Sequence, residues 1–214
     1  FLSESLSDVF YRKNPASSRE VIKANRVSGI RDESISQLMG DKVQQVNIYD
    51  NYLTLFFKNF LSPVANFGLL SYRYYLVDSA SIDGQWCYKL AFKPRRKQEY
   101  TFTGNMWIHD TTFAVKSIDI RIVDDANINY INDLVLQQEY SLVDGQWWML
   151  SKEKLVLDVN VMERDSTRSV GFYGTKTTTY RNFVINQPKE NEFYNTPVSV
   201  IVDKDAADKT DEFW

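Results

Sequence analysis

The sequence predicts an α+β fold, in which an antiparallel meander of strands carries helices grouped on one side. Apolar residues in the first third of the chain recur at helical spacing, whereas from Tyr72 onward they alternate with a period of two. Two Asp-Gly pairs, at 83–84 and 144–145, stand between alternating runs. Such pairs favour type I′ hairpin turns, because both central residues need a positive φ.

Helices are expected within about residues 1–63, over 17–29, 33–39 and 53–61. Ser17 and Glu20 have the spacing of a capping box at the start of the first helix. The third helix has the strongest pattern, because its apolar residues follow i, i+3, i+4, i+7, i+8 spacing. These residues are Leu53, Phe56, Phe57, Phe60 and Leu61.

Strands are expected over about residues 72–186, joined by short turns. The alternating runs fall at 72–82, 85–94, 100–109, 113–123, 134–143, 147–162 and 169–185. We expect a single domain over residues 1–202. Residues 203–214 carry more acidic than basic side chains and are interpreted as a solvated linker toward a missing C-terminal segment.

The composition excludes several classes of site. The 214 residues carry a net charge of −3, which does not favour binding to nucleic acid. With one cysteine and one histidine, the chain can form neither an internal disulfide nor a Cys- or His-rich zinc site, and no metal is predicted. No run approaches the ~18 apolar residues of a membrane-spanning helix.

Catalytic motifs are missing as well. The sequence has no G-x-G-x-x-G, P-loop or G-x-S-x-G motif. A catalytic triad would depend on His109, which stands at a predicted strand end beside Asp110 and is expected either to be solvated or to stabilise a turn. No pair of carboxylates is singled out for hydrolysis. We therefore expect a protein that is not an enzyme and has no cofactor.

The aromatic residues suggest a binding surface. They make up 14% of the chain, and alternate positions of consecutive strands would line one sheet face continuously. That face is either core covered by helices or the wall of an apolar cavity. The expected helix over 53–61 decides between the two, because its Phe side chains would leave little room if they filled the sheet. The candidate ligand-binding residues are Phe56, Phe60, Tyr88, Leu90, Phe92, Phe102, Met106 and Ile108.

A basic turn follows Phe92. It contains Lys93, Arg95, Arg96 and Lys97. Two interpretations remain open: a solvated hairpin loop, or a contact with phosphate headgroups or an acidic partner.

Several sequence words resemble the outer-membrane lipoprotein-carrier and lipoprotein-sorting superfamily. The words are Asp83 to Pro94, Phe102 to Asp110 and Ala114 to Lys116, in which His109 stands where the usual pattern has Asp. The resemblance implies a highly curved antiparallel β-sheet, an open half-barrel, with helices covering its open side.

Flanking words resemble a family of uncharacterised bacterial outer-membrane proteins. The words are Phe1 to Ser5, Arg26 to Gly29, Asn47 to Asn51, Leu61 to Ala65 and Tyr180 to Phe183. Proteins of that family place a carboxypeptidase-regulatory-like immunoglobulin-type domain first, a domain like this one next, and a membrane β-barrel last. The resemblance implies a periplasmic domain that is part of, or tethered to, an outer-membrane protein.

The leading functional expectation is a non-enzymatic periplasmic domain that binds an apolar ligand or a partner beside an outer-membrane barrel. A lipid or a lipoprotein acyl chain is the expected ligand class, and neighbouring domains of the same longer chain are the expected partners. The alternative is a purely structural or interaction spacer without a ligand cavity.

Overall fold

The computed structural model describes residues 2–28, 46–55, 58–96, 99–123, 128, 131–164, 168–195 and 199–206. The chain separates into two compact units. Unit 1 combines Phe1–Ser36 with Val184–Trp214, and unit 2 is Gln37–Phe183. The expected single domain over residues 1–202 is therefore not what the structure shows, because strands from the two ends of the chain pair with each other.

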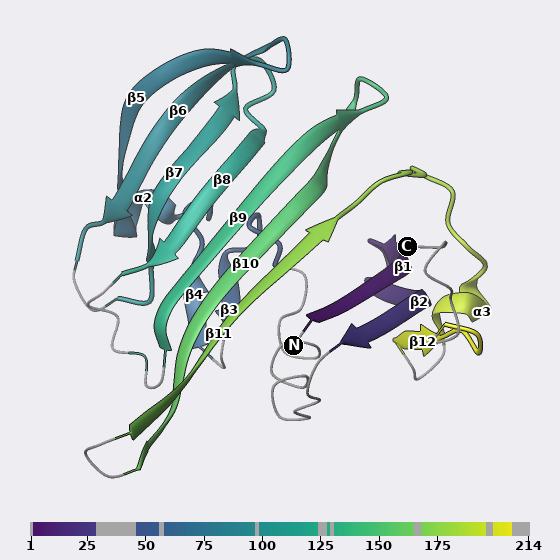
Figure 1. The fold of residues 1–214 in the computed structure, drawn as a ribbon. Coiled ribbons are helices and arrows are strands. Elements are labelled where there is room, and N and C mark those ends of the chain that lie inside the picture. Colours follow the sequence, from purple (N-terminus) through teal and green to yellow (C-terminus); the bar gives the residue numbers. More distant parts are fainter. Residues whose placement is uncertain are drawn as a thin grey trace. The chain divides into compact units, whose positions relative to one another are not determined.

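Unit 1 is built on a three-stranded sheet in the order β1–β2–β12 (Figure 1). Strands β1 (Leu2–Arg12) and β2 (Ser17–Ser28) form an antiparallel pair. The short β12 (Val200–Val202) runs parallel to β2. The four-residue helix α3 (Asn191–Tyr194) packs on this sheet through Phe193, whose ring centroid lies 4.8 Å from that of Phe10.

The predicted helix over 17–29 is wrong, because residues 17–28 form β2. A β-bulge explains the helical pattern. Leu6 pairs with Ala24 and Ser7 pairs with Ile22, so Lys23 is skipped in the register. The extra residue lets Val21 and Ala24, three apart, both be buried in an extended strand. The predicted helix over 33–39 lies outside the described residues.

The predicted linker at 203–214 is wrong in its first part. Residues 203–206 belong to unit 1, where the amide of Asn25 donates to the carbonyl of Ala206 (2.8 Å) and Ala206 is buried. The ammonium of Lys23 lies 3.0 Å from the carboxylate of Asp203. The composition predicted that this segment would be solvated, but these contacts hold it beside β2. Residues 207–214 lie outside the described part of the chain.

Unit 2 contains a seven-stranded antiparallel sheet in the order β11–β10–β9–β8–β7–β6–β5 (Figure 1). The alternating pattern predicted these strands closely. They are β5 (Tyr72–Ile82), β6 (Gln85–Pro94), β7 (Phe102–His109), β8 (Val115–Ile122), β9 (Ile131–Val143), β10 (Trp147–Arg164) and β11 (Arg168–Thr179). The predicted Asp-Gly turns are confirmed, since all four turn residues have a positive φ.

One edge of this sheet is irregular. In β5, the register with β6 shifts between Leu76 and Asp78, so Val77 is left out of the pairing. Strand β5 is the last in the sheet order, and the side chains of Leu76 and Val77 are exposed.

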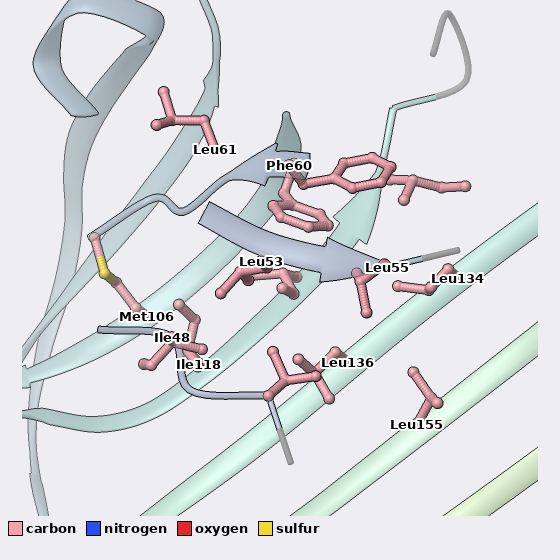
Figure 2. Packing of buried hydrophobic residues seen from close by; sticks show 14 of the residues in the cluster. Ile48, Leu53, Leu55, Phe60, Leu61, Met106, Ile118, Leu134, Leu136 and Leu155 are labelled. Carbon is pink, nitrogen blue, oxygen red and sulfur yellow. The ribbon is translucent and has the colours of Figure 1, made fainter. Parts of the chain in front are cut away.

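A hairpin covers the apolar face of the sheet. The predicted helix over 53–61 is wrong: β3 (Tyr52–Leu55) and β4 (Lys58–Leu61) pair antiparallel. The register places Leu53 opposite Phe60, so residues seven apart share a face, as they would after two helical turns. Figure 2 shows Leu53 and Leu55 between the hairpin and the sheet.

The fold of the described residues is therefore mainly antiparallel β-sheet. Their helices are α2 (Gly68–Ser71) and α3, each of four residues. The expectation of α+β, with helices covering the open side, is corrected to this extent: in the described part of unit 2, the cover is the β3–β4 hairpin.

Gly104 is required where β7 passes β8. It pairs with Phe92 on one side and Ile120 on the other. A Cβ at this position would lie 1.9 Å from the carbonyl oxygen of Asp119 and 3.1 Å from Cζ of Phe92. Because this oxygen belongs to the backbone, it cannot move aside as the end of a side chain could.

Replacing Gly104 tests this close approach. We expect Gly104→Ala to lower the free energy of unfolding by about 3 kcal/mol or more, because β7 and β8 must separate. Urea denaturation gives the measurement. The matched control is Gly84→Ala, where no atom lies within 4 Å and only the positive φ opposes the change, so a cost of about 1–2 kcal/mol is expected. Equal costs at the two positions would contradict the assignment.

Candidate functional site

Six of the eight side chains expected to line a ligand cavity form the core of unit 2 or pack against it. Phe60, Phe92, Phe102 and Met106 are each at most 3% exposed. Two others pack against this core and are partly buried, namely Leu90 and Ile108. Tyr88 is 40% exposed, and Phe56 lies outside the described residues.

The hairpin and the sheet are in direct contact through these aromatics. The rings of Phe60 and Phe102 stack with centroids 5.1 Å apart. Tyr72 is fully buried beside them; its hydroxyl donates to the carbonyl of Leu61 (2.5 Å) and accepts from the amide of Phe102 (3.0 Å). The residues predicted to line a cavity therefore do lie together, but they are packed against one another in the core.

Phe102→Ala distinguishes core from cavity wall. We expect it to cost about 3–5 kcal/mol of unfolding free energy in urea denaturation, because the side chain is fully enclosed. Tyr88→Ala, at a half-exposed position on β6, is the control and should cost under about 1 kcal/mol. A saturable fluorescent fatty acid whose binding is lost in Phe102→Ala, with an unchanged melting temperature, would instead show a ligand pocket.

A polar network is enclosed in the same core. Gln138 on β9 is fully buried, and its Nε2 donates to a carboxylate oxygen of Glu153 (2.5 Å) and to the carbonyl of Val46 (2.6 Å). The hydroxyl of Tyr140 donates to Oε1 of Gln138 (2.9 Å). The network therefore joins the chain segment before β3 to strands β9 and β10. The role of this network is structural, because its polar groups form hydrogen bonds with one another inside the fold.

Burial raises the pKa of Glu153 above its ordinary value, although hydrogen bonds from Gln138 and Val46 and the charge of Lys176 oppose the shift. The folded protein therefore binds this proton more tightly than the unfolded chain does. As pH rises from the ordinary carboxyl pKa to the raised one, the free energy of unfolding contributed by Glu153 falls, and above the raised pKa it stays constant.

Glu153→Gln should remove this component. The unfolding free energy of the variant relative to wild type is then expected to increase with pH above the ordinary pKa of 4.5. Urea denaturation of both proteins at a series of pH values gives the difference. Glu139→Gln, on an exposed carboxylate of β9, is the control. If wild type and Glu153→Gln have parallel pH profiles, the buried carboxylate does not titrate as described.

The opposite face of the sheet, called here the outer face, carries an open groove of about 660 Å³. Two neighbouring rows of side chains line it across β5 to β9, because residues on either side of a core residue point outward. One row is Tyr75, Ala91, Asn105 and Asp119, and the other is Lys93, Thr103, Arg121 and Val135. We call this hollow the outer-face groove.

The groove has a floor of small side chains and a rim of long ones. Ala91, Thr103 and Asn105 are partly buried, whereas Tyr75 and Lys93 are exposed. The ammonium of Lys93 lies 5.3 Å from the centroid of the Tyr75 ring, where it makes a cation–π contact. The rim therefore offers an aromatic surface and a positive charge above a floor with amide and hydroxyl groups.

Ion pairing fixes the other side of the groove. The guanidinium of Arg121 donates to both carboxylate oxygens of Asp133, at 2.8 and 2.9 Å. Asp119 accepts from Nε2 of Gln137 (2.7 Å). Sequence reasoning missed the groove, because its rows mix polar and small residues without an apolar signal. In the sequence, these residues are marked only by their positions in the strands, which alternate with those of the core residues.

A second hollow, of about 260 Å³, lies around Lys116. Its ammonium is 2.8 Å from the carboxylate of Asp83 and donates to the carbonyl of Tyr140 (3.2 Å). Lys116 thus ties the turn between β5 and β6 to β9. Because the amine is held by these contacts, the hollow is a structural junction.

The histidine has a structural role. Nδ1 of His109 accepts from the amide of Thr112 (3.2 Å) and lies 2.9 Å from its hydroxyl, so it closes the turn after β7 as expected. Cys87, its neighbour across the strands, is buried, and burial raises the pKa of the thiol. A raised pKa disfavours the thiolate that nucleophilic chemistry needs. The described residues contain no cluster of His, Cys, Asp and Glu suited to a metal ion.

The fold defines a two-unit protein built mainly on antiparallel β-sheet. The chain belongs to a family of unknown function, DUF5686, whose model matches residues 1–183. No curated protein and no solved structure matches the chain. Within the described residues, no helix has the length and hydropathy to cross a membrane.

Proposed function

We propose that the chain is a non-enzymatic binding module that holds a partner in the outer-face groove. The supporting observation is the groove itself, whose volume of about 660 Å³ lies within the range typical of binding sites. Its floor offers the amide of Asn105 and the hydroxyl oxygen of Thr103, which donates to the carbonyl of Phe92 (3.3 Å) and can accept from a ligand. Its rim offers the ring of Tyr75 and the charge of Lys93. This mixed lining suits a polypeptide segment, which presents backbone polar groups and side chains together.

An apolar ligand such as a lipid or a lipoprotein acyl chain fits the structure less well. Such a ligand would have to occupy the core face, where β3–β4 already covers the sheet and Phe60 stacks on Phe102. Its entry would need displacement of the hairpin and loss of those contacts. Binding in the outer-face groove needs no such rearrangement.

The place of action rests on the sequence resemblance. We propose a periplasmic location within an outer-membrane protein, with neighbouring domains of the same longer chain as the first partners to consider. The groove lies on unit 2 alone, so the proposal does not depend on how the two units are arranged.

The packed core favours a second candidate function, a structural spacer without any ligand. Under that function, the outer-face groove would remain exposed to solvent in the intact protein. The two functions therefore differ in whether the groove is occupied in cells.

Site-specific photo-crosslinking tests the difference. A benzoylphenylalanine residue at Asn105 in the full-length protein, expressed in its native cells, should give a discrete crosslinked product, because a bound segment would lie directly above it. The matched control is the same residue at Thr177, which lies on the outer face in the same cross-strand row but at the far edge strand. We expect no product there.

Filling the groove provides a second control. Ala91→Trp, in the floor between Tyr75 and Asn105, should abolish the Asn105 product while leaving the melting temperature of the purified chain nearly unchanged. Equal products from Asn105 and Thr177, or no product from either, would contradict the groove proposal. The second of these results would favour the spacer.

A further inference from the structure

An exposed apolar turn lies beside the basic turn of unit 2. Leu69 and Leu70 of helix α2 are 71% and 74% exposed, and Phe67 just before the helix is 37% exposed. Leucines are seldom this exposed in adjacent positions without a reason, because each leaves a large apolar area in water. The helix has only four residues, so they form a protruding knob rather than an extended face.

Cations stand close to this knob in the chain and in the strand register. Arg73 follows two residues after α2 and pairs across the strands with Lys93, and Arg95 and Arg96 follow β6. All four side chains belong to exposed residues. Glu99 is the nearby carboxylate, and it is 3.3 Å from Arg96. Positive charge is thus concentrated here, although the whole chain has a net charge of −3.

Hydrogen bonds hold the two turns together. Nε of Arg95 donates to the carbonyls of Leu69 and Tyr72, each at 2.9 Å. The amide of Arg95 donates to the carbonyl of Ser71 at 2.7 Å. Arg95 is thus fixed against α2. Together with the exposed residues close to it in the chain, it defines what is here called the α2 patch, made of Phe67, Leu69, Leu70, Arg73, Arg95 and Arg96.

We propose that the α2 patch docks the chain on an anionic membrane surface. Leu69 and Leu70 enter the boundary between headgroups and acyl chains, and the arginines contact lipid phosphates. The combination supports this occupant: apolar side chains gain from leaving water, while neighbouring cations gain from a negative surface potential. The patch is separate from the floor of the outer-face groove, so this inference stands independently of the proposed function.

An acidic protein would use the same arginines but would not need two protruding leucines in water. An apolar protein partner would use the leucines, yet it would not require negative charge. An anionic membrane surface matches both features at once, and it is the occupant that we propose.

Vesicle flotation of the 214-residue chain tests the proposal. The probes are vesicles of phosphatidylcholine alone and vesicles of phosphatidylcholine mixed with phosphatidylglycerol. We expect flotation with the anionic vesicles only, weakened by added salt because exposed charges are screened. The double variant Leu69→Ser/Leu70→Ser should reduce binding on the order of tenfold or more. Arg73→Gln and Arg96→Gln should each reduce it about fivefold. Arg95 is left unchanged because its side chain supports the backbone of α2.

Matched controls use exposed residues outside the patch. Phe113→Asn removes an aromatic side chain that is 75% exposed in the turn before β8, and Lys152→Gln removes an exposed cation of β10. Both variants should float like wild type.

The proposal is overturned if wild type fails to bind anionic vesicles, or if the controls lose binding as much as the patch variants do. It is also overturned if the arginine variants weaken binding and the leucine variant does not, a result that would indicate adsorption by charge alone, without entry of the leucines into the lipid. The crosslinking from Asn105 is a separate measurement, so either proposal can fail without the other.

Discussion

The hydroxyl of Tyr72 is the contact on which the interior of unit 2 depends. It donates to the last residue of the covering hairpin and accepts from the first amide of β7, so one buried group fixes β4, β5 and β7 together. Burial raises the pKa of this hydroxyl, which keeps its proton available for donation. Nearby, the hydroxyl of Tyr74 donates to the carbonyl of Pro63 (2.6 Å), and burial raises its pKa to about 12. The two tyrosines therefore bind the end of the hairpin, and the residue two positions after it, to the sheet.

Because the hairpin is held in this way, the apolar face of the sheet is already covered. Phe60, Leu53 and Leu55 lie where a ligand of the expected class would lie (Figure 2). The two surfaces proposed for binding in the described part of unit 2, the outer-face groove and the α2 patch, are therefore exposed to solvent. Each combines apolar atoms with charge, which a packed interior would tolerate poorly.

The sequence predicted the seven long strands of unit 2 well, because alternation and the Asp-Gly turns are local properties. It failed where two extended segments imitate a helix. A bulge that skips Lys23 places Val21 and Ala24 on one side, and a tight hairpin places Leu53 opposite Phe60. The residue spacings in both cases equal those of a helix, and only pairing with a distant strand separates the alternatives. The predicted site was selected for its apolar residues, so it marked the core; the groove residues, such as Thr103 and Asn105, are defined by register across strands and not by their own hydropathy.

The irregular β5 has a consequence for how the protein behaves in a crowded compartment. A straight edge strand offers a regular ladder of amides and carbonyls to any other extended chain, which leads to edge-to-edge aggregation. Where Val77 interrupts the register, that ladder is broken and the strand twists locally. The bulge therefore disfavours the pairing of another extended chain along β5, although Leu76 and Val77 are apolar and exposed. A single inserted residue can thus protect an edge strand through its geometry.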